Sequence, residues 1–148
     1  MGVPDRGPEY ERPPGVDDAT VEAVGTLSEA FEWLERARGC LYDFHQMMGH
    51  VDIEMGRASE QLKNAGHASM AELVEQQVVG RNVLQGRWTF QVVDEFDACY
   101  YGPVSAVERS VREELMQGRR HVFEAEMKRR EQSGRSGDGS GGGAKRRT

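Results

Sequence analysis

The chain has no long apolar run, and cysteine and aromatic residues are scarce in it. None of its 148 residues belongs to a stretch approaching the roughly 18 consecutive apolar residues that a membrane-spanning helix needs. The first fifteen residues are polar and proline-rich, without the apolar segment of a secretory signal. We therefore expect no membrane association and a location in the cytoplasm.

Only two cysteines are present, Cys40 and Cys99, and two are too few for a disulfide-stapled scaffold. Neither lies at the CxxC spacing of a metal site. We expect both to be small buried apolar side chains in a reducing compartment, with a Cys40–Cys99 bridge as the alternative.

An excess of positive charge is also missing, because the net charge is −6. An acidic folded segment is a poor general binder of nucleic acid. The Gly/Ser-rich tail 133–148 ends in a basic tip, Lys145, Arg146 and Arg147. This tip could contact nucleic acid or simply be solvated, and elsewhere we expect no nucleic-acid binding.

What the sequence does contain is an unbroken heptad pattern, in which apolar residues alternate at spacings of three and four. Such a series predicts one long α-helix with a seam facing another helix. His45 lies at heptad position e, beside this seam. The seam positions are Leu27, Ala30, Leu34, Ala37, Leu41, Phe44, Met48, Val51, Met55, Ala58 and Leu62.

Capping signals and glycines predict where the helices begin and end. Ser69 to Glu72 forms a capping box, Gly66 suits a helix stop, and Gly102-Pro103 suits a turn before a third helix. The predicted fold is all-α, an antiparallel three-helix bundle with long coiled-coil-like helices and disordered termini. Its predicted parts are a disordered tail 1–17, a bundle 18–132 with helices at about 20–64, 69–100 and 103–131, and a disordered tail 133–148.

Counting outward from the two predicted turns gives an approximate register. With the first turn near residues 66–67, residue n of the first helix lies level with about residue 133−n of the second, which brings Arg38 near Glu95. A second turn near residue 102 would place His50 level with His121. We expect the carboxylates near the end of the second helix to form salt bridges with arginines.

Two same-face pairs on the predicted helices could hold a divalent metal ion. They are His50 with Glu54 and His121 with Glu124. The Glu-x-x-His pattern of di-iron bundles is absent, because Tyr42 and Gly118 stand three residues before His45 and His121. The alternative is that both pairs are solvated, and the sequence identifies no cofactor.

A polar stretch interrupts the second predicted helix, where a central helix could not bury such groups without partners. These residues either pair with polar groups of the other helices or line a cleft for a small molecule. The ligand-binding candidates are Tyr42, His45, Arg81, Asn82, Gln85 and Trp88.

Four large apolar residues beside or outside the seam are candidates for an interface: Phe31, Trp33, Tyr42 and Ile53. The alternative is that the third helix covers them. No catalytic residue is indicated, and an enzyme is the less favoured class. The sequence favours a non-enzymatic protein–protein interaction module that self-associates or docks a partner through a helix face. The alternative is a ligand- or metal-binding bundle.

Overall fold

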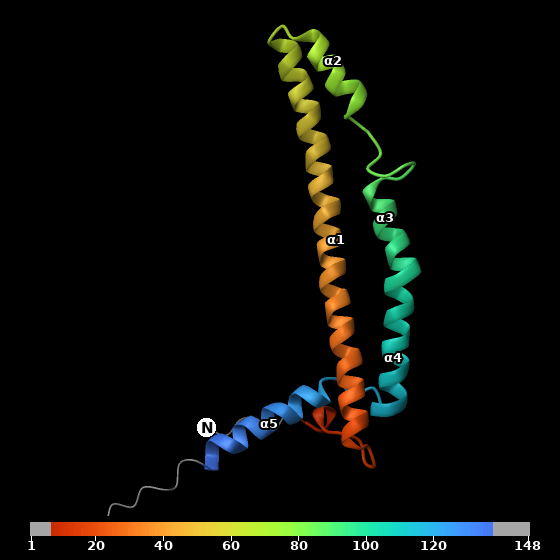
Figure 1. The fold of residues 1–148 in the computed structure, drawn as a ribbon, viewed down its shortest axis with the longest axis vertical. Helices are drawn as coiled ribbons and strands as arrows, with labels where there is room; N and C mark the ends of the chain where they lie inside the picture. The colour runs from red at the N-terminus through yellow and green to blue at the C-terminus, as the bar shows by residue number, and fades with distance from the viewer. Residues whose placement is uncertain (1–6, 138–148) are drawn as a thin grey trace, which may run out of the picture. The chain divides into compact units, whose positions relative to one another are not determined.

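The computed structural model describes residues 7–137, which form an all-α structure (Figure 1). Within these residues no strand forms, so the all-α part of the prediction is confirmed. Residues 1–6 and 138–148, including the basic tip Lys145, Arg146 and Arg147, lie outside the described residues. The elements in chain order are η1 (Pro8–Tyr10), α1 (Asp18–Asn64), α2 (Ala68–Gln77), α3 (Thr89–Phe96), η2 (Asp97–Tyr101), α4 (Gly102–Met116) and α5 (Val122–Gly137).

The chain divides into two compact units rather than the one bundle predicted. The first unit contains the described residues 7–31 and 106–137, and the second contains residues 32–105. We describe each unit separately.

Helix α1 matches the long first helix predicted from the heptad pattern (Figure 1). It begins after Asp17, whose carboxylate accepts a 2.8 Å hydrogen bond from the Thr20 N–H as a helix cap does. It ends at Asn64, and Gly66 follows with a φ of 88°, as predicted for a left-handed stop. Gly25 lies inside α1, where a Cβ atom would come 2.9 Å from the Cβ of Phe123. Glycine is therefore required there for close packing.

The second predicted helix, 69–100, is interrupted between Gln77 and Thr89. Gly80 and Gly86 both have a φ of 70°, a left-handed conformation that breaks a helix and that glycine adopts without strain. Leu84 and Arg87 form an isolated bridge across the tight turn that contains Gly86. The prediction of one continuous helix treated these glycines as tolerated interior residues, whereas they adopt turn conformations.

The chain makes no turn at Gly102-Pro103, so the prediction of a third helix starting there is wrong. Elements α3, η2 and α4 follow one another without a non-helical residue between them. The π-helical turn η2 lets the Gly102 N–H bond to the carbonyl of Asp97, five residues back. A Cβ at Gly102 would lie 3.0 Å from that carbonyl oxygen. The wider turn and the glycine together accommodate Pro103 without ending the helix.

The predicted helix 103–131 is instead interrupted between Met116 and Val122. Gln117 and Gly118 are left-handed, and the Gly118 N–H bonds to the Arg112 carbonyl, six residues back, so the helical hydrogen-bond pattern ends here. His121 also has a positive φ, of 59°. The second register count, which placed His50 level with His121, therefore loses the turn on which it depended.

The first unit has a small apolar core. Its buried residues are Val21, Val24, Met116 and Val122, with Val16, Val111 and Phe123 packed against them. Met116 is the most deeply buried, with 1% of its surface exposed. Residues 7–17, which were predicted to belong to a disordered tail, are placed in this unit. Arg12 donates two hydrogen bonds, of 2.7 and 2.8 Å, to the carboxylate of Glu126 on α5.

In the second unit the chain returns antiparallel to α1, and polar groups join the two. One residue of α1 at every seventh position makes a hydrogen bond to the returning segment, and we call these four bonds the clips. They join Arg38 to Asp97, His45 to Thr89, Asp52 to Gly80 and Ser59 to Ala71. All four agree with the predicted register within a few residues, so the first register count is confirmed.

Candidate functional site

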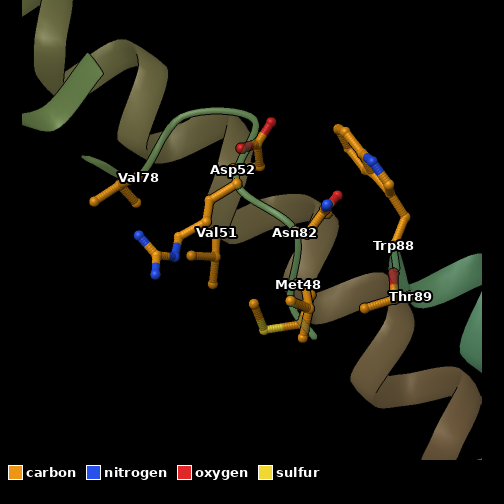
Figure 2. A pocket seen from close by; sticks show the side chains of 10 residues that line it. Met48, Val51, Asp52, Val78, Asn82, Trp88 and Thr89 are labelled. Atoms are coloured by element: carbon orange, nitrogen blue, oxygen red, sulfur yellow. The ribbon is translucent and has the colours of Figure 1, made fainter. Parts of the chain in front are cut away.

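The second unit contains a cleft between α1 and the loop that follows α2, with a volume of about 340 Å³. Figure 2 shows Met48 and Asp52 on α1, with Val78 and Asn82 on the loop and Trp88 and Thr89 at its end. The cleft is mostly apolar, with a few polar groups at its margin. Its lining residues are Met48, Gly49, Val51, Asp52, Val78, Arg81, Asn82, Val83, Trp88 and Thr89.

Two of the clips fix the loop that forms one wall of this cleft. The Asp52 carboxylate accepts a 2.7 Å hydrogen bond from the Gly80 N–H, which the glycine's left-handed backbone directs toward α1. At the other end of the loop, His45 Nδ1 lies 2.7 Å from the hydroxyl of Thr89. Asp52 thus positions the backbone of the loop at Gly80, and His45 positions the start of α3 at Thr89.

The six ligand-binding candidates separate into two groups in the structure. Arg81, Asn82 and Trp88 line the cleft. The other three, Tyr42, His45 and Gln85, are not among its lining residues. Tyr42 instead lies beneath the guanidinium of Arg38, whose Cζ is 5.1 Å from the ring centroid. His45 bonds to Thr89, and Gln85 is exposed in the turn.

The clip at Asp97, the first residue of η2, is a salt bridge. Arg38 donates from Nε and Nη2 to the two carboxylate oxygens of Asp97, at 2.8 and 2.9 Å. These hydrogen bonds lower the pKa of the Asp97 carboxyl. The predicted partner of Arg38 was Glu95, two residues away, but Glu95 pairs with Arg87. The expected salt bridges between arginines and these carboxylates are present, but Arg38 pairs with Asp97 rather than with Glu95.

Tyr101 lies beside this salt bridge, and its hydroxyl donates a hydrogen bond to Glu35. This bond raises the pKa of the tyrosine hydroxyl, because it stabilises the protonated form beside a carboxylate. The Arg38 guanidinium lies 4.5 Å from the Tyr101 ring centroid. Arg38 therefore contacts a carboxylate and an aromatic ring at once.

The metal candidates lie in different units. His121 and Glu124, in the first unit, have Nδ1 and Oε1 3.9 Å apart. His50 and Glu54, in the second unit, are exposed on α1, and Glu54 is paired with Arg57 at 2.7 Å. A carboxylate so paired must release its arginine before it can bind a metal ion. The metal site stays a prediction.

The apolar surface of α1 in the second unit is divided between two faces. The seam residues Leu34, Leu41 and Met48 are half-buried, whereas Phe44 and Val51 are exposed. The returning segment thus occupies the side of α1 that carries the clips. It leaves exposed a row of side chains, apolar except for Glu54, that we call the outer stripe; only Ala58 at its end is half-buried. The outer stripe consists of Trp33, Ala37, Cys40, Phe44, Met47, Val51, Glu54 and Ala58, at alternating spacings of four and three.

Two large side chains of the outer stripe, Trp33 and Met47, are strongly exposed. Trp33 has 61% of its surface exposed and Met47 has 59%. A shallow groove runs along part of the same face, lined by Met47, His50, Val51, Glu54, Met55 and Ala58. Cys40 is a free, exposed thiol, and so is Cys99, which corrects the expectation that both are buried.

Only one of the four interface candidates belongs to the outer stripe. Trp33 does, whereas Tyr42 and Ile53 are exposed about 180–200° around the helix from it, at 100° per residue. Phe31 is half-buried and lies in the first unit. Sequence reasoning missed Phe44 and Val51 as surface residues because it assigned the whole seam to the returning helix, and it gave no role to Met47, which lies outside the seam.

No protein-family model, curated protein or solved structure matches this chain. None of the helices within residues 7–137 has the combination of length and apolarity that a bilayer crossing requires. The cleft and the outer stripe are the two surface features that indicate a function.

Proposed function

We propose that this protein is a non-enzymatic protein–protein interaction module that docks an amphipathic helix along the outer stripe and self-associates through it. The observation that carries the proposal is the largely exposed row on α1, in which seven of eight positions at heptad spacing are apolar. Apolar rows of this kind on a helix pack against a second helix. Water would otherwise cover large side chains such as Trp33, Phe44 and Met47.

The arrangement of the clips supports the same conclusion. Because polar groups at every seventh residue hold the returning segment, the fold of this unit does not use the outer stripe for its own packing. The stripe is thus available to a partner without unfolding. Free thiols at Cys40 and Cys99 suit the reducing cytoplasm, where we propose the protein works.

Two residues of equal exposure on opposite sides of α1 provide a matched test. Met47 is 59% exposed on the outer stripe, and Ile53 is 60% exposed on the other side. We expect the wild type to sediment above the 16.6 kDa monomer mass at micromolar concentrations. Met47→Glu should weaken association at least about 100-fold, since a carboxylate enters an apolar contact, and Ile53→Glu should not. A monomeric wild type, or equal effects of the two variants, would contradict the proposal.

The cleft supports a second candidate function, the binding of a small amphipathic molecule. Apolar residues form its walls, and the guanidinium of Arg81 and the amide of Asn82 lie among its polar lining, which suits a ligand with an apolar body and an acidic group. Anilinonaphthalene sulfonate is a suitable probe, with Trp88 as the reporter in a Trp33→Phe background. Saturable binding that Arg81→Ala weakens would support this function. Binding that responds equally to Arg57→Ala, an exposed arginine outside the cleft, would refute it.

A further inference from the structure

The residue spacing of the outer stripe is symmetric along α1. Its spacings of four and three read the same in both directions along α1, about a point midway between Phe44 and Met47. If a second copy of α1 lies antiparallel and crosses at that point, every stripe residue faces a stripe residue of the other copy. The facing pairs are Trp33 with Ala58, Ala37 with Glu54, Cys40 with Val51, and Phe44 with Met47.

These facing pairs are complementary in size. The largest side chain of the stripe, Trp33, would lie opposite Ala58, one of the smallest, at each end of the contact. At the centre, Phe44 would lie opposite Met47, and methionine sulfur packs favourably against aromatic rings. A parallel arrangement would instead place each residue opposite its own copy, with Trp33 against Trp33 and Ala58 against Ala58, which crowds one end and leaves the other open.

The charges along one edge of the stripe favour the same orientation. Glu54 belongs to the stripe, and Arg36 flanks it. At 100° per residue the two side chains project from the same side of α1, near opposite ends of the stripe. In an antiparallel pair Arg36 of one copy lies next to Glu54 of the other, twice by symmetry. In a parallel pair the two side chains would lie on opposite sides of the contact and at different levels, so they could not pair. In the antiparallel pair Glu54 would exchange its present partner, Arg57, for Arg36 of the other copy. The Arg36 guanidinium already stacks over Trp33, 4.7 Å from the ring centroid, so it is held at the stripe's edge.

We propose that the helix docked on the outer stripe is α1 of a second copy of this chain, antiparallel, in the register that places Phe44 opposite Met47. This inference rests on the proposed function, because it names the partner and its orientation. The contact spans residues 33–58, or about 39 Å of helix at 1.5 Å per residue. Its two-fold symmetry makes the same surface serve both copies and closes the assembly at two.

Native cysteine chemistry distinguishes the orientations. In the proposed register Cys40 lies about 16 Å along the helix axis from Cys40 of the other copy, beyond the reach of a disulfide. Val51→Cys would put a thiol directly opposite Cys40. The test compares three full-length variants under copper–phenanthroline oxidation: Cys99→Ser alone, Cys99→Ser with Val51→Cys, and Cys99→Ser with Val51→Cys and Cys40→Ser. The sedimentation mass of each is measured under reducing conditions.

We expect a covalent dimer from the Val51→Cys, Cys99→Ser variant alone. Cross-linking of Cys99→Ser and also of the variant lacking Cys40 would indicate parallel pairing and overturn this inference, while self-association through the stripe would stand. A dimer mass with no cross-link in any variant would also overturn the register but not the proposed function. A monomer mass for all three, shared with the wild type, would overturn both.

Discussion

Along α1, residues 18–31 and residues 32–64 use their apolar side chains in opposite ways. In the first unit Val21 and Val24 are buried in a small core with Met116 and Val122. In the second unit the clip residues face the returning segment, and Phe44, Met47 and Val51 are exposed. One unit is held mainly by apolar burial, whereas the other is aligned by hydrogen bonds and keeps its apolar row uncovered.

A heptad pattern alone therefore does not determine which helix packs against its apolar residues. Both segments of α1 contribute to the same unbroken series of apolar seam residues. The series begins at Leu27, after the buried Val21 and Val24. Within it Leu34, Leu41 and Met48 are half-buried, whereas Phe44 and Val51 are exposed.

The apolar core of the first unit should be sensitive to truncation. Met116→Ala removes the most buried side chain and is expected to lower the free energy of unfolding by about 2–5 kcal/mol. Urea denaturation followed by circular dichroism measures this loss. Phe44→Ala, a truncation on the outer stripe, serves as the control at concentrations where the chain is monomeric. Equal losses in the two variants would erase the contrast between the units.

A single clip should contribute less than the core. Ser59 is buried and donates a 3.1 Å hydrogen bond to the Ala71 carbonyl. Ser59→Ala removes this bond with little change of volume, and we expect a loss of about 1 kcal/mol of unfolding free energy. The local effect is measured by hydrogen exchange, as faster exchange of the α2 amides. If exchange in α2 stayed unchanged, the clip would not be what holds that helix.

The clip between Arg38 and Asp97 should make the second unit sensitive to acid. Because the pKa of Asp97 is lowered in the fold, the stabilisation is fully present above the ordinary aspartate pKa and is lost as the pH falls through the lowered value. Thermal unfolding at a series of pH values from 7 to about 2.5 should therefore show a smaller acid-induced drop in Asp97→Asn than in the wild type.

Glu126 in the first unit needs a separate control in that experiment, because hydrogen bonds from Arg12 lower its pKa as well. Glu126→Gln should remove its own part of the acid dependence and leave the part due to Asp97. An Asp97→Asn variant with the full wild-type acid dependence would exclude this clip as a source of pH-dependent stability.

The features that sequence predicted well were those that depend on local spacing. The extent of α1 and the antiparallel return followed from the seam and from Gly66, and the register count found the level of all four clips. In each case a short stretch of sequence determined the outcome. Arg81, Asn82 and Trp88 do line a cleft, but in a loop rather than in the continuous helix from which they were singled out, and ligand binding there stays a prediction.

The features that sequence missed depend on backbone conformation or on distant contacts. Gly80 and Gly86 adopt left-handed turns, whereas Gly39 and Gly49 remain helical, and propensity does not separate these cases. Pro103 was interpreted as a helix start because a π-helical turn that accommodates proline has no simple sequence signature. The clips did leave a signal, since Arg38, His45, Asp52 and Ser59 recur every seven residues.

The four clips differ in chemistry, and this guards the chain against misalignment. If the returning segment slipped by one heptad so that Arg38 met Thr89, Asp52 would face the Ala71 carbonyl, and two acceptors would meet without a proton between them. Asp97 would lose its arginine at the same time. A row of interchangeable leucines would have tolerated that slip. Mutations could therefore accumulate along the outer stripe, and partners could change, while the hairpin beneath kept its alignment.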